Sequence, residues 1–382
     1  MYNFPLACEL DGVKGGMSSK RWLAPWKDSV EKPAIYHCIS RVVDRRFVFG
    51  DAEREHFRMF MRMQENFSGC RVLSYCIMSN HFHLLLEVPP MPVGGISDAE
   101  LLKRLTATNS EAFVAVVAKE LAEARVADRE SWVAEIHARF TYRMHNLSEF
   151  MKTLLQRFTR WFNRTHQRSG TLWEERYKSV IVESGIAART MAAYIDLNPV
   201  RAGMVSDPAE YRWSSYGEAV GGGPKGNGRK SREGLVRACM GHHGAGFEAE
   251  KWKDVSRIYR RLMGLALGRK SGNAEVDLQR RSQTAATTME AMESGDNGTL
   301  LPDLKLAAML RCRVRYFTDG AVIGSKTFVN ETFAAARDRF TERRKDGARR
   351  MKGNGKAAAG VLWSLRDLRV RVQGPDICKE PC

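Results

Sequence analysis

The stretch at 75–88 constrains the fold of this chain more than any other part of the sequence. It is apolar and alternating, with a short polar break at 79–80. Alternation with a period of two residues is typical of β-strands, so the stretch predicts two short strands or one bent strand. Side chains two positions apart share one face of a strand. We therefore expect His81 and His83 to project together, with Phe82 packed behind them.

Two imidazole groups side by side on a rigid strand form a bidentate platform for a divalent metal. The alternative is a pair of histidines that only fill the core or lie on the surface, since a lone histidine marks a ligand only with supporting context. The strand pattern leaves both interpretations open.

The composition of the chain limits the classes of molecule that it is expected to bind. The 382 residues carry a formal net charge of +17 and a pI near 9.7, which favours polyanions, with nucleic acid ahead of an anionic membrane surface. The sequence has no run of eighteen apolar residues and no apolar signal core at its N-terminus, so we expect neither a membrane span nor secretion. Eight scattered cysteines without a CxxC pair argue against a zinc site and a disulfide scaffold, and a reducing cytoplasm is expected.

Further elements extend this pattern. We expect a strand at 35–40, a helix at 51–67 with Asp51 as its N-cap, and strands at 71–78 and 81–88, and this β-α-β-β order indicates a ferredoxin-like half. The later elements are a core helix at 147–164, a strand at 179–183 and a helix at 185–198 that Pro199 ends. The predicted organisation is an N-terminal lead at 1–33, a catalytic domain at 34–217 with a helical insertion at about 91–146, a Gly-rich linker at 218–230, and a basic, mostly helical C-terminal region at 231–382.

Tyr194 and Asn198 are the second candidate site. They lie four residues apart on one predicted helix, so their side chains share a helix face. Tyrosine can act as a covalent nucleophile, and the amide oxygen could join two histidines as a third metal ligand. The alternative is a core aromatic residue followed by a helix cap, because Asn-Pro often ends a helix.

A basic segment rich in aromatic residues spans 152–178. Cations hold phosphates and aromatic rings stack on bases in proteins that bind single strands, although a solvated helix face with buried aromatics would have the same composition. The DNA-binding candidates are Arg160, Arg168, Trp173, Arg176, Tyr177 and Lys178.

These motifs together resemble a known family. His81-Phe-His83, after Met78-Ser-Asn80, looks like the metal-binding HUH motif of the single-tyrosine transposases. The stretches at 160–163, 170–179, 194–203 and 211–216 resemble the later blocks of that family, most closely its REP-associated tyrosine transposase branch. The resemblance implies a ferredoxin-like core flanked by helices. It also implies palindromic repeat DNA as substrate and allows a homodimer.

Carried over by position, the resemblance implies that His81, His83 and Asn198 hold a divalent metal, Mg²⁺ or Mn²⁺, and that Tyr194 is the nucleophile. From residue chemistry alone, two histidines and an amide suit these ions less well than carboxylates would. The insertion, the N-terminal lead and the C-terminal region depart from the compact family form.

The fold class predicted is therefore α+β, an antiparallel ferredoxin-like sheet flanked by helices. The predicted function is a transposase-like endonuclease and strand transferase that cleaves single-stranded or hairpin DNA through a 5′-phosphotyrosine. It would act in the cytoplasm at the nucleoid. Two alternatives stay open, a non-catalytic nucleic-acid-binding protein on the same fold and a metal-dependent hydrolase without a covalent step.

Overall fold

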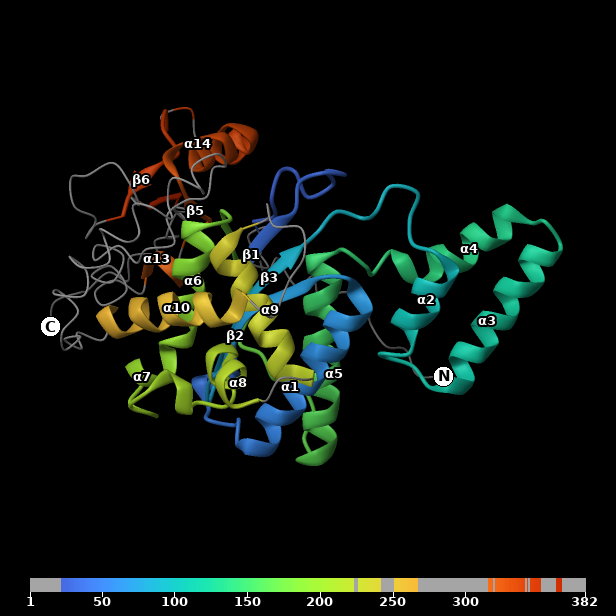
Figure 1. The fold of residues 1–382 in the computed structure, drawn as a ribbon, viewed down its shortest axis with the longest axis horizontal. Coiled ribbons are helices and arrows are strands. Elements are labelled where there is room, and N and C mark those ends of the chain that lie inside the picture. The colour runs from blue at the N-terminus through green and yellow to red at the C-terminus, as the bar shows by residue number, and fades with distance from the viewer. Residues whose placement is uncertain are drawn as a thin grey trace, which may run out of the picture.

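The computed structural model (Figure 1) places the chain around one mixed β-sheet. It describes residues 22–222, 226–241, 251–266, 315–318, 320–340, 342, 344–351 and 362–365. Most of the predicted N-terminal lead and large parts of the predicted C-terminal region lie outside the described residues. No described helix is both long and apolar enough to cross a membrane.

The first four strands form the predicted ferredoxin-like unit. Their order in the sheet is β2-β3-β1-β4, and all of their pairings are antiparallel. The unit consists of β1 (Ala34–Arg41), α1 (Asp51–Ser68), β2 (Arg71–Ile77), β3 (His81–Val88), α5 (Leu147–Thr165) and β4 (Lys178–Val182). The α+β class is therefore confirmed, and each of these elements lies where the sequence pattern predicted it.

The alternation along β3 separates two faces of the sheet. Phe82, Leu84 and Leu86 are buried on the face that α1 and α5 cover, and the rings of Phe57 and Phe82 lie 4.6 Å apart. The opposite face carries His83 and is covered by α6 (Ile186–Asp196), which contacts β2, β3 and β4. The candidate ligands therefore face α6.

Two local predictions about helix ends are wrong. Gly50, rather than Asp51, is the N-cap of α1; the Asp51 carboxylate lies in the first turn, where it pairs with Arg54 at 3.2 Å. The helix predicted at 185–198 is α6, and it ends at Asp196 rather than at Pro199. Pro199 lies in the first turn of the short α7 (Asn198–Arg201). Proline is tolerated in a first turn because its missing N–H would have no helical partner there.

The C-terminal region adds strands to the same sheet. β5 (Val322–Gly324) pairs in parallel with β4, and β7 (Trp363–Leu365) and β6 (Arg349–Arg350) follow it. The helices around them are α13 (Arg315–Thr318) and α14 (Lys326–Ala335). The edge of β4 is thus paired within the chain by residues that the sequence pattern assigned to a mostly helical region.

The insertion forms three helices that project to the right in Figure 1. They are α2 (Asp98–Leu105), α3 (Glu111–Val126) and α4 (Glu130–Thr141). The sequence Ser97-x-x-Glu100 is typical of a capping box at a helix start, and the Ser97 hydroxyl accepts the N–H of Glu100 at 3.2 Å, so Ser97 is the N-cap of α2. Their apolar side chains build a small cluster of their own, which Phe67 of α1 joins. The insertion therefore packs on the outside of the core, as predicted.

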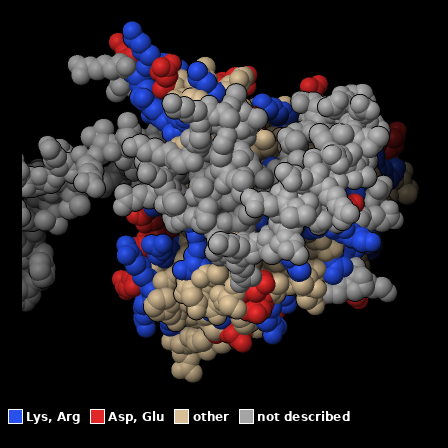
Figure 2. Space-filling model, turned by 60° about the vertical axis from the view of Figure 1, so that its left-hand side comes forward, with Lys and Arg blue, Asp and Glu red and all other residues tan. Residues whose placement is uncertain are grey.

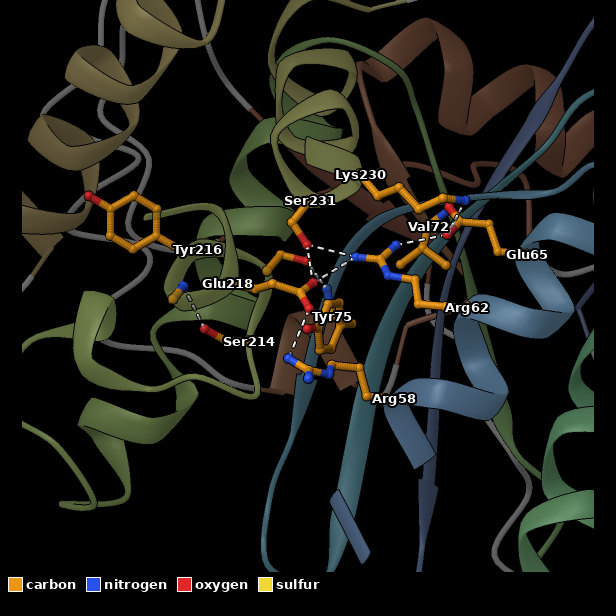
Figure 3. A network of polar contacts seen from close by, with 12 residues as sticks. Arg58, Arg62, Glu65, Val72, Tyr75, Ser214, Tyr216, Glu218, Lys230 and Ser231 are labelled. Atoms are coloured by element: carbon orange, nitrogen blue, oxygen red, sulfur yellow. Dashed lines mark hydrogen bonds and ion pairs between the residues drawn. The ribbon is translucent and has the colours of Figure 1, made fainter. Parts of the chain in front are cut away.

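A buried network ties α8 (Ser215–Gly221) and α9 (Gly226–Met240) to α1, as Figure 3 shows. Glu218 accepts from Arg58 at 3.0 Å and from Arg62 at 2.9 Å, and Arg62 also donates to Ser231 at 2.7 Å. A buried carboxylate is stable only when it is paired in this way.

The sequence pattern predicted a Gly-rich linker at 218–230. Residues 218–221 instead belong to α8 and residues 226–230 to α9. Glycine has a packing role in this part of the fold, because a Cβ at Gly234 of α9 would lie 2.4 Å from the Val72 carbonyl oxygen of β2. The remaining described helices are α10 (Trp252–Ala266) and the 3-10 helices Val43–Arg45, Pro208–Glu210 and Arg337–Arg339.

Candidate active site

A cavity of about 440 Å³ opens at one end of the ferredoxin-like unit. The register places Arg41 opposite His81 and Ile39 opposite Lys178, so the end of β1 meets the starts of β3 and β4 there. The cavity is lined by Ile39, Ser40, Arg41, Arg45, His81, His83, Glu174, Glu175, Arg176, Lys178, Tyr194, Asn198 and Thr318. It therefore brings together the predicted nucleophile, all three predicted metal ligands and two of the predicted DNA-binding residues.

The two histidines of β3 are neutral at physiological pH. Their ring centroids lie 5.1 Å apart. Burial lowers the pKa of His81 to about 4, with a smaller contribution from the positive charge of Arg41. Burial also holds the pKa of His83 well below its usual range, assisted by His81, His37 and Arg41. Neutral imidazole is the form that coordinates metals.

Hydrogen bonds set the tautomer of both rings. His37 Nδ1 lies 2.9 Å from the Phe317 carbonyl oxygen, which can only accept, so His37 donates from Nδ1 and accepts at Nε2. His83 Nδ1 lies 3.0 Å from that Nε2 and therefore carries the proton of the bond. His81 Nδ1 donates to Asn80 Oδ1 at 2.7 Å. In both rings the lone pair is left on Nε2, which is available for a metal.

Tyr194 lies in α6 among aromatic rings. Its ring stacks on Phe317 at a centroid distance of 4.5 Å, and His83 approaches its ring at 5.7 Å with nearly perpendicular planes. The Arg201 guanidinium lies over the ring at 5.5 Å. The residue is 1% exposed and is one of the residues that line the cavity.

A buried carboxylate anchors the helix that carries Tyr194. Asp196 accepts from the Tyr259 hydroxyl at 2.7 Å and from the Tyr216 N–H at 3.0 Å, which ties α6 to α10 and α8. Burial raises the pKa of Asp196 to about 7, and these hydrogen bonds oppose the rise. In this structure α6 is thus bonded to the core at the turn next to Tyr194.

The Asn198 side chain follows the end of α6. Its amide nitrogen donates to the carbonyl oxygens of Tyr194 at 3.1 Å and Ile195 at 3.3 Å, which is the capping role that the sequence left open. The amide oxygen is the other end of the same group, and the residue lines the cavity. Capping and metal ligation are therefore compatible, because they use different atoms.

The donor set of the cavity fits a divalent cation. The side chains of His81, His83 and Asn198 line the cavity, as do those of Glu174 and Glu175, and imidazole, amide and carboxylate groups all serve as ligands of divalent cations. No group of three or more His, Cys, Asp or Glu side chains within the described ranges is arranged as a metal site. The amide of Asn198 would thus have to complete the site.

Four cations line the cavity: Arg41, Arg45, Arg176 and Lys178. All four are exposed, and none of them forms an ion pair with a described carboxylate, whereas all three arginines of α1 are paired. Figure 2 shows that basic side chains recur over the described part of one face, with acidic side chains between them. Exposed cations around a cavity that two neutral histidines line are suited to hold phosphate groups.

The other predicted DNA-binding residues lie elsewhere. Arg160 and Arg168 are on α5 and on the loop that follows it, outside the cavity lining. Trp173 donates from its indole N–H to Thr159 at 2.9 Å and packs its ring against Phe82 at 5.6 Å, and Tyr177 is buried. Neither aromatic ring lines the cavity, because both are used in packing the core.

Sequence reasoning missed several residues of the site. Arg41 is the last residue of β1, and Arg45 lies in the turn that follows, with a positive φ of 55° and a carbonyl oxygen that accepts from the Asn80 side chain at 2.9 Å. The basic run at 41–46 was a signal for them. His37 was visible only through the strand register, and no local signal indicates Phe317 or Thr318.

None of the curated proteins matches the chain. The chain is similar to one solved structure, described as the structure of a REP-associated tyrosine transposase bound to a REP hairpin, with 11% identity and a TM-score of 0.33 over 55% of this chain and 90% of that chain.

Residues 31–113 match the family model "Transposase IS200 like". The matched stretch contains β1, α1, β2 and β3 and therefore His81 and His83, whereas Tyr194 and Asn198 lie beyond it. The resemblance to the single-tyrosine transposases is thus confirmed over residues 31–113, the stretch that matches this family model.

Proposed function

We propose that this protein is a transposase-like enzyme that cleaves and rejoins single-stranded or hairpin DNA through Tyr194. The observation that carries the proposal is the shared cavity, which is lined by a tyrosine, two neutral histidines whose lone pairs are on Nε2, an amide and four cations. The matched family model over 31–113 supports a DNA-acting function.

In the proposed reaction the Tyr194 hydroxyl oxygen attacks a backbone phosphorus. The bond from phosphorus to the 3′ oxygen breaks, the tyrosine proton is lost, and the departing oxygen is protonated to a 3′-OH. The products are a 5′-phosphotyrosine and a free 3′-OH, and attack by a 3′-OH on that linkage rejoins the strand. A divalent cation held by His81, His83 and Asn198 would polarise the phosphate oxygens when bound.

The cations of the cavity would hold the DNA. Arg41 and Arg45 lie at the end of β1 and just after it, and Arg176 and Lys178 lie at the start of β4 and just before it, so a strand that enters the cavity would meet cations from both neighbouring segments. The acidic pair Glu174 and Glu175 directly precedes Arg176 and also lines the cavity, so it disfavours a phosphate there unless a cation is also present.

A covalent adduct tests the proposed function directly. The full-length protein would be incubated with hairpin DNA labelled at its 3′ end, which is the end that stays with a 5′-phosphotyrosine, and with Mn²⁺, and the products would be analysed on a denaturing gel. We expect labelled DNA that migrates with the protein and is released by protease. If no adduct forms on any single-stranded or hairpin substrate, the covalent mechanism is wrong.

One observation favours the non-catalytic alternative. Tyr194 is 1% exposed and its ring is covered by Phe317, so a protein that only binds DNA could use the residue for packing. Binding without an adduct in the same assay would select this alternative. The homodimer that the resemblance allows, and action at the nucleoid, stay predictions.

The salt dependence of DNA binding is expected to locate the phosphate contacts. Each neutralised phosphate of a single strand contributes a slope of roughly −0.7 in log K against log salt. Arg176→Ala and Lys178→Ala should each make the slope shallower by a fraction of a unit up to about one. Fluorescence anisotropy at several salt concentrations would measure both effects.

Arg139→Ala is the matched control for these variants, because Arg139 lies on the insertion and pairs with Glu120. It should leave the slope unchanged. If neither cavity variant alters the slope, the DNA phosphates do not contact Arg176 or Lys178. Arg160 and Arg168 would then be the next residues to replace.

A further inference from the structure

We propose that His37 is a positioning residue that holds His83 in the tautomer required for metal binding, and that the backbone of residue 317 sets the orientation of His37. The inference rests on the metal role proposed for His83. It assigns a task to one residue of β1 and to a segment of the C-terminal region.

The geometry of this relay is a chain of two hydrogen bonds. Phe317 O accepts from His37 Nδ1 at 2.9 Å, and His37 Nε2 accepts from His83 Nδ1 at 3.0 Å. The rings of His37 and His83 lie 5.2 Å apart and within 16° of parallel. His37 is fully buried and His83 is 3% exposed, so no solvent competes for these bonds. Each nitrogen involved therefore has one partner, and the direction of each bond is determined.

The position of His37 in the sheet explains why it can reach both partners. It lies on β1, next to β3 on one side and β4 on the other, opposite Leu85 and Val180. His37 is two residues from Ile39, so these two side chains share one face of β1. Ile39 lies directly opposite His83, so His37 and His83 project from the same face of the sheet. The pairing of β5 with β4 places α13, which contains Phe317, against β4 next to His37.

The tautomer matters because a neutral imidazole has one lone pair. With the proton on Nδ1, the lone pair of His83 is on Nε2. With the proton on Nε2, the same ring would offer an N–H group in place of a ligand. Partners of this kind raise the basicity of a metal-binding histidine and fix its orientation.

Residue 317 also contacts the other half of the site. Its ring stacks on Tyr194 at 4.5 Å, while its carbonyl oxygen accepts from His37. One residue of the C-terminal region thus supports both the proposed nucleophile and, through His37, one proposed metal ligand.

Mn²⁺ binding to the full-length protein tests the positioning role without any activity assay. His37→Leu places an apolar side chain of similar size in the core, and this side chain can neither donate nor accept a hydrogen bond. We expect its Mn²⁺ affinity, measured by electron paramagnetic resonance of the free ion, to fall about 10- to 100-fold. His37→Gln can accept from His83 and donate to the Phe317 carbonyl, so it should recover most of the affinity.

The tautomer itself can be read in the metal-free protein. Long-range ¹H–¹⁵N spectra of ¹⁵N-histidine-labelled protein should show His83 protonated on Nδ1 in the wild type, and this signal should move or split in His37→Leu. This measurement on the wild type needs no variant to fold. His83 protonated on Nε2 in the wild type would overturn the proposal.

His145→Leu is the matched control, since His145 also bonds a backbone carbonyl, that of Pro89 at 2.9 Å, but lies outside the cavity lining. It should cost stability without changing Mn²⁺ affinity. Equal affinity in wild type and His37→Leu would overturn the positioning role and leave the proposed function intact. Wild-type protein that does not bind Mn²⁺ would overturn the metal role and the positioning role together.

Discussion

Tyr194→Phe is expected to abolish the covalent protein–DNA adduct and all strand cleavage. The change removes the hydroxyl oxygen that is proposed to attack the phosphate and leaves the ring, its stacking on Phe317 and its contact with His83 in place. DNA affinity should change by no more than about tenfold, because a single hydroxyl contributes roughly 0.5–1.5 kcal/mol through a hydrogen bond. Denaturing gels would measure the adduct, and anisotropy would measure binding.

Tyr177→Phe is the matched control for this experiment. Tyr177 lies between two residues of the cavity wall, Arg176 and Lys178, but is itself buried outside the lining. The control should form the adduct at the wild-type level. An adduct that persists in Tyr194→Phe and disappears in Tyr177→Phe would transfer the nucleophile to Tyr177 and refute the assignment made here.

Replacing His81 and His83 together with alanine is expected to reduce DNA cleavage by about a hundredfold or more. A metal at a phosphoryl centre supplies several kcal/mol of charge stabilisation in the transition state, and each 1.36 kcal/mol is a factor of ten in rate. Excess EDTA should have the same effect on the wild-type protein. Single-turnover cleavage with and without added Mn²⁺ would measure both losses.

A melting curve must accompany the double variant. His83 is buried and bonded to His37, so its removal leaves a buried acceptor without its donor and costs stability as well. His81 is less buried, and His81→Ala alone should lose activity with little loss of stability. Cleavage that continues undiminished in excess chelator would exclude the metal role, whatever the variants do.

The predicted insertion shows how far local patterns reach. The cap at Ser97 and the helical stretch after it could be predicted from the sequence, because a capping pattern and a helical period each involve residues only a few positions apart. Its division into three helices with a separate apolar cluster was not predicted. That division depends on how Phe67 of α1 and the insertion helices pack, which is a tertiary property.

The loop at 168–178 shows the limit of composition. Its charges and rings predicted a DNA surface, and Arg176 and Lys178 do line the cavity. Trp173 and Tyr177 instead pack into the core. Composition cannot separate a ring that stacks on a base from a ring that fills the core, because both need the same apolar surface.

The sequence by itself determined the ferredoxin-like order of elements and the common face of His81 and His83. Both follow from the strand period of two and the helix period of 3.6, which are local properties of the chain. Only the tertiary structure decided that His37 bonds Phe317 across 280 residues, and that β5 extends the sheet beside β4. Such contacts join segments whose separation carries no periodic signal, and they form because burial and hydrogen bonding are satisfied over the whole core at once.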